Sequence, residues 1–221
     1  MSSEDVVYPV PAREVRREHV VLNSRFIALL APADTPEQAR AFFARVRREF
    51  PDATHHVPAY IIGHGGGVAA YASDAGEPAG SAGRPILAVL RGRGLGDAAL
   101  VVVRYFGGTK LGVGGLVRAY TRSAQIVVDA APIACKTLVH TAMLGIPYAW
   151  LEQARRLIKK HGGVVLDEAY AAEVTLTFQL PVGGFDEFQT DLRGVSAGAL
   201  EALILETALA RWPRCPASIR R

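Results

Sequence analysis

A glycine-rich stretch near the middle of the chain has the composition of an anion-binding turn. Residues 107–115 read GGTKLGVGG, and a helix is predicted to follow at residues 116–130. Backbone N–H groups of such a turn can approach an anion closely, and a helix N-terminus adds positive potential. Gly107, Gly108 and Lys110 are therefore candidate anion-binding residues. The alternative is that these glycines only permit tight turns and close packing.

Basic residues surround this stretch. Between Arg84 and Arg122 there are seven basic residues against one acid, Asp97, although the whole chain has a net charge of only +4. Arg118 and Arg122 are four positions apart, so they share one face of the predicted helix. A local excess of positive charge attracts an anionic partner. Arg84, Arg104, Arg118 and Arg122 are thus candidate contacts to a nucleic acid or another anion, and a solvated arginine-rich surface is the alternative.

Two acidic residues, Asp74 and Glu77, lie in the loop of residues 73–85 (SDAGEPAGSAGRP). General acid–base work would require a nucleophile or a metal beside them, and the chain contains neither HExxH nor GxSxG. The glycine-rich stretch matches neither GxxxxGK[ST] nor GxGxxG. We therefore expect salt-bridging or loop-capping roles for Asp74 and Glu77, and we predict no catalytic residue.

Histidine and cysteine give no sign of a metal site. His55 and His56 are adjacent on a predicted strand, so their side chains point to opposite faces, and His64 lies beyond the strand. Cys135 and Cys215 are far apart, and their spacing is that of neither a disulfide framework nor a zinc site. We expect no metal and no cofactor.

The first half of the chain is predicted to contain strands and helices in alternation. Thr35 is a predicted N-cap, Pro36 occupies the first helical position, Gln38 completes a capping box, and Pro51 ends this helix. After a loose polar start, the other elements are strands at 25–31, 54–62, 67–73 and 98–106 and helices at 86–90 and 116–130. Aromatic residues are expected in the core or in strand packing, with base stacking by an exposed tyrosine left open: Phe42, Phe43, Phe50, Tyr60, Tyr71 and Tyr105.

A domain boundary is predicted near Pro132, because the order of elements changes there. The second half is predicted as strand 137–146, helix 148–161, strands 164–170 and 173–180, helix 185–192 and strand 199–205, followed by a frayed tail at 211–221. This βαββαβ order is typical of the ferredoxin-like fold. The fold class is therefore α+β, with two domains.

Four segments of this sequence resemble the IMPACT/YigZ family. They are SRFIALLAP, RREFPDATHHVPAY, YASDAGEPAGSAGRPIL and LVVVRYFGGTKLGVGGLVRAYTRSA, and the last one matches the signature stretch of the family along nearly its whole length. The likeness extends over residues 15–206. The chain departs from bacterial members at Ala75, where a second acidic residue usually follows the position of Asp74.

The resemblance implies two domains. Residues 15–131 would form an IMPACT N-terminal-type domain similar to ribosomal protein S5 domain 2. Residues 135–206 would form a ferredoxin-like domain similar to elongation factor G domain V. Eukaryotic relatives regulate translation through an additional N-terminal RWD domain, and this chain begins directly with the shared domain. RNA or ribosome association is the role usually suggested for bacterial members.

No apolar run is long enough to span a membrane, and the first twenty residues contain no secretory signal. We expect a non-enzymatic cytoplasmic factor that binds RNA, the ribosome or a translation factor and modulates translation. One alternative is a small enzyme that holds a phosphorylated metabolite at the glycine-rich turn, with Asp74 or Glu77 as base. Another alternative is an adaptor that binds a protein partner along an edge strand of the second domain.

Overall fold

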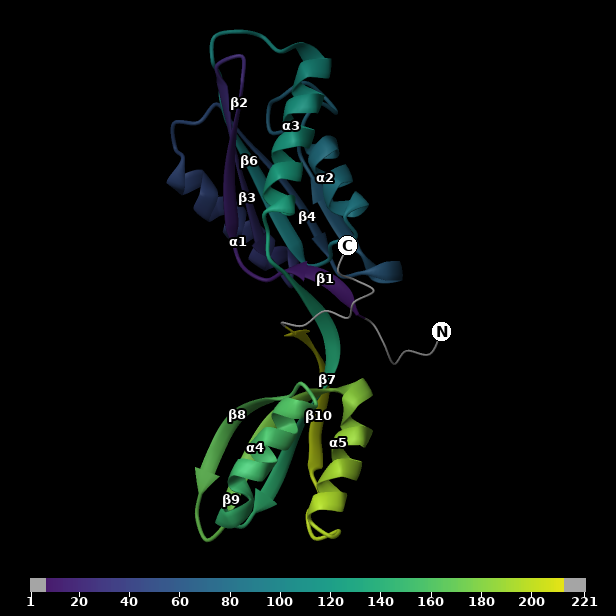
Figure 1. Ribbon diagram of the computed structural model, residues 1–221. Helices are drawn as coiled ribbons and strands as arrows, with labels where there is room; N and C mark the ends of the chain where they lie inside the picture. The colour runs from purple at the N-terminus through teal and green to yellow at the C-terminus, as the bar shows by residue number, and fades with distance from the viewer. Residues whose placement is uncertain (1–6, 213–221) are drawn as a thin grey trace. The chain divides into compact units, whose positions relative to one another are not determined.

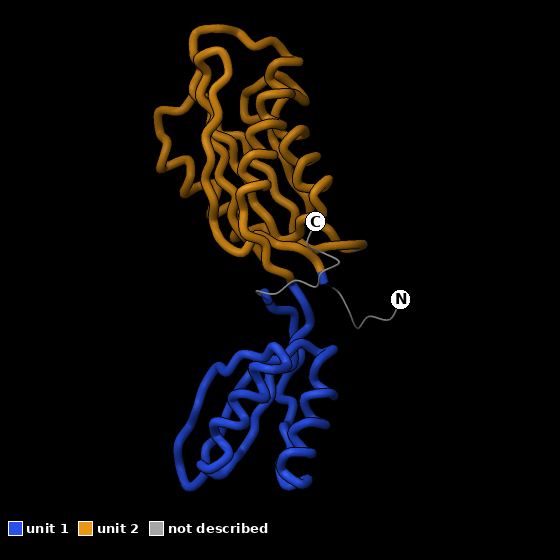
Figure 2. The backbone as a smooth tube through the Cα atoms, in the orientation of Figure 1, with its two compact units in different colours: residues 1–7, 136–212 blue, residues 8–135, 213–221 orange. Residues whose placement is uncertain are grey.

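The computed structural model describes residues 7–212, which form two compact units (Figures 1 and 2). The N-terminal unit holds residues 8–135 and the C-terminal unit holds residues 136–212. The strands are β1 (Tyr8–Pro11), β2 (Val15–Val21), β3 (Ser24–Pro32), β4 (His55–Ile62), β5 (Ala69–Ala72), β6 (Ala98–Tyr105), β7 (Ile133–Ile146), β8 (Val164–Tyr170), β9 (Val174–Pro181) and β10 (Leu203–Trp212). The α-helices are α1 (Pro36–Glu49), α2 (Gly83–Gly92), α3 (Gly112–Asp129), α4 (Leu151–Lys160) and α5 (Val182–Val195), and 3-10 turns lie at Gly65–Gly67 and Tyr148–Trp150.

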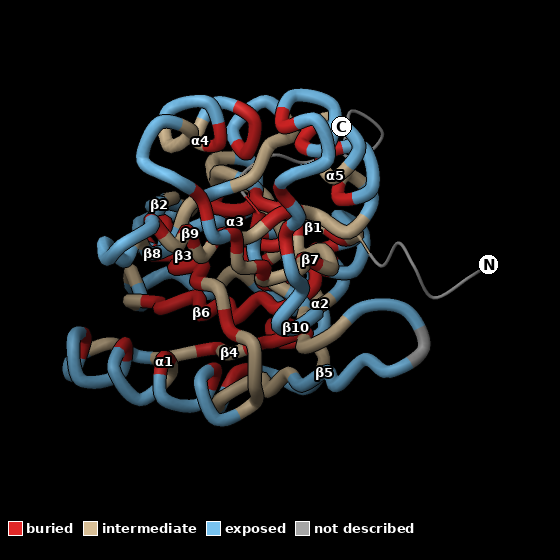
Figure 3. Tube along the Cα trace, turned by 90° about the horizontal axis from the view of Figure 1, so that it is seen from below, coloured by how far each residue is buried: buried red, intermediate tan, exposed pale blue. Residues whose placement is uncertain are grey.

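The N-terminal unit is built on a five-stranded antiparallel sheet in the order β2-β3-β6-β4-β5. Both faces of this sheet are covered. Leu100 and Val102 of β6 pack in a core with α2 and α3, whereas Val101 and Val103 pack in a second core with α1. Figure 3 shows the buried positions gathered along β3, β4 and β6, with the outer side of α1 exposed. Burial on both faces explains why β6 is a continuous apolar run.

The first helix confirms its sequence signals. The Thr35 hydroxyl accepts a hydrogen bond of 3.2 Å from the N–H of Gln38, and the Gln38 side chain accepts one from the N–H of Asp34. Two other helices begin earlier than predicted, α2 at Gly83 and α3 at Gly112. Their first turns contain glycines, which the prediction assigned to loops because glycine has a low helix propensity.

The sequence suggested a loose polar start before residue 25, but residues 8–24 contain two strands; residues 1–6 lie outside the described part of the chain. The strand β2 pairs with β3 along its whole length, and Leu22 and Asn23 form the turn between them with positive φ angles of 44° and 64°. The charged residues of β2 hid this strand because it lies at the sheet edge, where most side chains face solvent. The preceding strand β1 is also ordered, and the Tyr8 hydroxyl donates a 2.8 Å hydrogen bond to Asp97.

The C-terminal unit has the predicted ferredoxin-like order, β7-α4-β8-β9-α5-β10. Its strands lie in the order β10-β7-β9-β8, and β1 is a further neighbour of β7. Alternate residues of β9, from Val174 to Leu180, pack in one core with α4 and α5. The last strand lies further along than predicted and includes residues 211 and 212 of the expected tail; residues 213–221 lie outside the described residues.

Cysteine also requires a correction. Cys135, which lies near the start of β7, is buried and disulfide-bonded. The sequence spacing had suggested no disulfide. Cys215 lies outside the described part of the chain.

Candidate anion-binding site

The candidate site is built where the chain leaves β6 and enters α3. The intervening loop passes against the turn between β2 and β3, and the N–H of Gly107 donates a 3.1 Å hydrogen bond to the Ser24 hydroxyl. A Cβ atom at Gly107 would lie 2.1–2.3 Å from backbone atoms of Asn23 and Ser24. Gly107 is therefore required by close backbone packing. Gly108 has a φ of +85° and open space around its Cα, so it serves the turn conformation.

The N-terminus of α3 has no cap among the described side chains. Leu111 occupies the N-cap position without a side-chain hydrogen bond, and the first turn contains no acidic residue. The first N–H groups of a helix have no partner inside the helix, and they carry positive partial charge. The first turn of α3 therefore offers backbone donors to an anion. Because Gly112 and Gly114 have no side chain, no Cβ atom at these two positions covers the donors.

A pocket of about 260 Å³ opens beside this helix end. It combines one buried ion pair, one exposed lysine and an apolar wall. Its lining residues are Glu77, Pro78, Arg104, Phe106, Lys110, Leu111, Gly112, Val113 and Leu116.

Arg104 lines this pocket and is almost completely buried. Its Nη1 donates a 2.7 Å hydrogen bond to Glu77 Oε1, and its guanidinium carbon lies 5.5 Å and 5.6 Å from the ring centres of Phe26 and Phe106. Arg104 Nε is buried and has no hydrogen-bond partner within residues 7–212. A buried donor without a partner is unusual in a folded protein.

Glu77 also contacts Tyr120, a residue of the core that lies between the sheet and helices α2 and α3. The Tyr120 hydroxyl donates a 2.6 Å hydrogen bond to the same oxygen that Arg104 contacts. Burial, together with the hydrogen bond and the negative charge of Glu77, raises the pKa of Tyr120 far above its usual range. Tyr120 was missed as a site residue, although it lies four positions after Leu116 on the buried face of α3.

Asp74 organises the loop before α2. Its carboxylate accepts hydrogen bonds from the N–H groups of Gly80, Ala82 and Gly83, at 2.8, 3.1 and 2.9 Å. Burial alone would raise the pKa of Asp74, but these amides and the charge of Arg84 lower it below the usual value. Asp74 thus caps the loop through backbone N–H groups, and Glu77 forms an ion pair with Arg104.

The remaining candidate cations are exposed. Arg84, Lys110, Arg118 and Arg122 have no ion pair with any acid that the structure describes, whereas Arg93 is paired with Asp129. This difference leaves the charge of the four residues available to a partner. Arg104 differs from them, since it is buried and already holds Glu77.

Only some of these cations lie near the pocket. The guanidinium of Arg118 comes within 4.0 Å of the position of a Cβ on Gly114, so it folds back over the first turn of α3. Arg122 faces β2, where burial and the charge of Arg122 together lower the pKa of His19. Arg84 lies at the start of α2, near Asp74. The structure therefore brings Arg104, Lys110 and Arg118 to the end of α3 and places Arg84 and Arg122 on its flanks.

Histidine does not contribute to this site as a metal ligand. The His55 ring bonds the carbonyl of Ala75 at 2.9 Å, the His56 ring bonds that of Phe50 at 2.8 Å, and His64 stacks on Tyr8. No group of three histidine, cysteine or acidic residues within the described ranges is placed to hold a metal ion.

Comparison with known proteins identifies the family. The Impact N-terminal domain matches residues 22–128, and a domain of unknown function, DUF1949, matches residues 144–199. The chain is 38% identical to the IMPACT family member YigZ of Escherichia coli (strain K12), over 89% of this chain and 97% of that protein. This chain belongs to the IMPACT family. An IMPACT family member of Haemophilus influenzae is 36% identical over 90% of this chain and 97% of its own length.

A solved structure supports the assignment of fold to this IMPACT family chain. A crystal structure described as that of a hypothetical protein is 37% identical, with a TM-score of 0.58 over 90% of this chain and 98% of that one. The family resemblance and the two-domain α+β class are thus confirmed. No helix in residues 7–212 is long and apolar enough to cross a membrane.

Proposed function

We propose that this IMPACT family chain binds RNA of the translation machinery through the exposed basic surface around the N-terminus of α3. Lys110 and Arg118 contact phosphates beside the uncapped helix end, and Arg84 and Arg122 extend the contact on either side. By binding RNA or the ribosome, the protein modulates translation. The protein acts in the cytoplasm, and its action includes no catalytic step.

One observation carries this proposal. The uncapped end of α3 adjoins a pocket that is lined by the buried Arg104 and by the exposed Lys110, which has no ion pair with an acid that the structure describes. Helix N-termini and unpaired cations both favour phosphate oxygens. Family membership supports the same conclusion, because eukaryotic members that the sequence resembles act in translation.

The alternative of a phosphometabolite enzyme is less well supported. Asp74 accepts three backbone hydrogen bonds, and Glu77 is held by Arg104 and Tyr120. Neither carboxylate is therefore available as a general base in this arrangement. An adaptor that uses an edge strand of the C-terminal unit has candidate edges in β8 and β10, but those edges lack the charge pattern seen at α3.

The proposal is tested with the double variant Arg118→Glu/Arg122→Glu and a short labelled RNA at low salt. Both side chains are exposed, so each substitution is expected to change the free energy of unfolding by no more than about 0.5 kcal/mol. RNA affinity should fall by about tenfold or more, and uniformly across RNA sequences, because phosphate contacts do not read bases.

The matched control is Arg156→Glu/Lys159→Glu on α4, which makes the same change in net charge in the C-terminal unit. Arg156 and Lys159 are exposed, and neither forms an ion pair with an acid that the structure describes. The control should retain most of the RNA affinity. An Arg118→Glu/Arg122→Glu variant that is folded and binds RNA as the parent does would overturn the proposal.

A further inference from the structure

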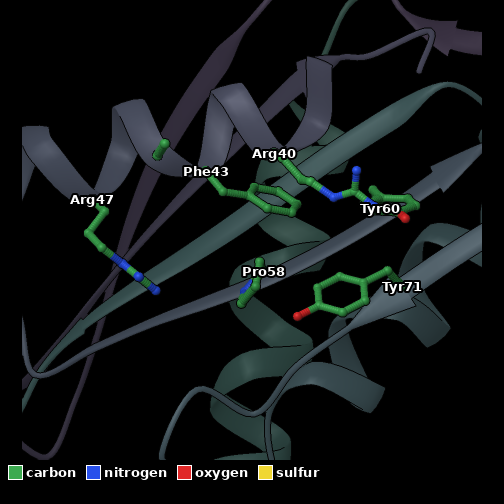
Figure 4. A pocket seen from close by; sticks show the side chains of 7 residues that line it. Arg40, Phe43, Arg47, Pro58, Tyr60 and Tyr71 are labelled. Carbon is green, nitrogen blue, oxygen red and sulfur yellow. The ribbon is translucent and has the colours of Figure 1, made fainter. Parts of the chain in front are cut away.

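A second groove lies on the face of the sheet opposite to α2 and α3. It has a volume of about 380 Å³ between α1 and the edge formed by β4 and β5 (Figure 4). Because the sheet separates the core under α1 from the core under α3, this groove is distinct from the anion-binding pocket. Its lining residues are Arg40, Phe43, Ala44, Arg47, Pro58, Tyr60 and Tyr71.

Four residues of α1 line one wall of the groove: Arg40, Phe43, Ala44 and Arg47. Arg40, Phe43 and Arg47 follow the spacing i, i+3 and i+7, so they lie on one side of the helix. Figure 4 shows the Phe43 ring between the two arginines, with all three side chains extending over the strands. The helix therefore places a guanidinium on either side of an aromatic ring.

A row of aromatic rings continues from this wall across the sheet. Tyr60 of β4 is opposite Tyr71 of β5 in the register, so both rings are on the α1 face. The ring centres of Phe43 and Tyr60 are 6.3 Å apart at an interplanar angle of 21°, and those of Tyr60 and Tyr71 are 5.5 Å apart at 26°. Tyr71 ends the row on the edge strand and is 46% exposed. Nearly parallel rings that end in an exposed ring form a platform on which a base can stack.

The charges at the groove have one sign. Arg47 has no ion pair among residues 7–212, and Arg40 pairs only with Glu37, at 3.1 Å, in a pair whose side chains are both mostly exposed. No acidic residue lines the groove. Exposed pairs of this kind contribute little, so both guanidinium groups can bind phosphate.

We propose that this groove binds an unpaired base of single-stranded RNA together with its neighbouring phosphates, an inference that rests on the proposed function. The base stacks on the exposed ring of Tyr71 at the end of the aromatic row, and Arg40 and Arg47 contact the phosphates. An acidic peptide would use the arginines but not the ring platform, whereas each nucleotide brings both a planar base and a phosphate. The Tyr71 hydroxyl has no hydrogen-bond partner in the described part of the chain, so it can bond a ribose 2′-hydroxyl, which favours RNA over DNA.

The test measures the affinity of the full chain for a labelled hexamer of adenylate RNA at low salt. Tyr71→Ala should weaken binding by about tenfold to a hundredfold, because stacking on an aromatic side chain contributes on that scale. Tyr71→Phe should keep most of the affinity for RNA, because it keeps the ring. Arg47→Ala should weaken binding, whereas Arg48→Ala, the adjacent exposed arginine outside the groove, should not.

Three results would overturn the inference. The first is that Tyr71→Ala and Arg47→Ala are folded and bind the hexamer as the parent does. The second is that a deoxyadenylate hexamer binds as tightly as RNA, and the third is that a polyglutamate peptide binds the parent as tightly as the hexamer and loses affinity in Arg47→Ala but not in Tyr71→Ala. The Arg118→Glu/Arg122→Glu variant is measured in the same assay. If it loses affinity while the groove variants do not, the groove fails and the proposed function stands. If the groove variants lose affinity while the Arg118→Glu/Arg122→Glu variant does not, the proposed RNA-binding surface at α3 is wrong and binding at the groove is supported.

Discussion

Glu77 and Arg104 form an ion pair of 2.7 Å in the interior of the N-terminal unit, where their side chains are only 3% and 6% exposed. The pair joins the loop before α2 to the end of β6. Tyr120 of α3 donates to the same carboxylate oxygen, so three elements meet at one buried charge. The candidate anion-binding pocket is therefore positioned by a polar network rather than by the glycines alone.

Removal of the charge on Glu77 should destabilise the unit strongly. In Glu77→Gln, the buried guanidinium of Arg104 loses its counter-ion, which typically lowers the free energy of unfolding by about 3–5 kcal/mol. The exposed pair of Glu18 with Arg25 provides the control, and Glu18→Gln should cost about 1 kcal/mol or less. Urea unfolding of both variants measures the difference, and equal small losses would contradict the role given to the buried pair.

Gly107 and Gly108 should differ in their tolerance of a side chain. Gly107→Ala places a Cβ against the backbone of Asn23, so the loop must move, and we expect a loss of about 3 kcal/mol or more. Gly108→Ala meets no atom within 4 Å and suffers only from its positive φ, at about 1–2 kcal/mol. Thermal or urea unfolding compares the two variants. A Gly108→Ala variant that is the less stable would show that close packing is not what requires Gly107.

Asp74 should make the stability of the N-terminal unit depend on pH in the acid range. Its folded pKa is lowered, so its carboxylate binds fewer protons in the folded than in the unfolded state. Its contribution is fully present above the ordinary carboxyl pKa of about 3.9 and is lost as the pH falls through the lower folded value. Asp74→Asn should flatten this part of the curve of unfolding free energy against pH. A curve for Asp74→Asn with the parent's acid slope would contradict the assignment.

Local signals were sufficient to predict α1 from the sequence. Thr35, Pro36 and Gln38 define its first turn through contacts between neighbours in the chain, and Pro51 limits its end. The start of α3 was predicted four residues late, because glycines at Gly112, Gly114 and Gly115 obscure a first turn that tertiary packing maintains.

The candidate site could be predicted only in its composition. Lys110 and Arg118 are visible as cations beside a glycine-rich turn, but the burial of Arg104 depends on Glu77, which is 27 positions away in the sequence. The aromatic row of Tyr60 and Tyr71 depends on the register between β4 and β5. Contacts between residues that are distant in the sequence are set by strand pairing, and strand pairing cannot be predicted from the local sequence.

Phosphate binding at the N-terminus of α3 is tested by the salt dependence of RNA binding, measured for the parent chain and for Arg118→Glu/Arg122→Glu. If about five phosphates are contacted, the logarithm of the affinity for single-stranded RNA should fall with the logarithm of salt concentration at a slope near −3.5. The double variant should show a slope that is shallower by about 1.4, because two of those contacts are lost. A parent slope near zero, or an identical slope in the two proteins, would contradict phosphate binding at the N-terminus of α3.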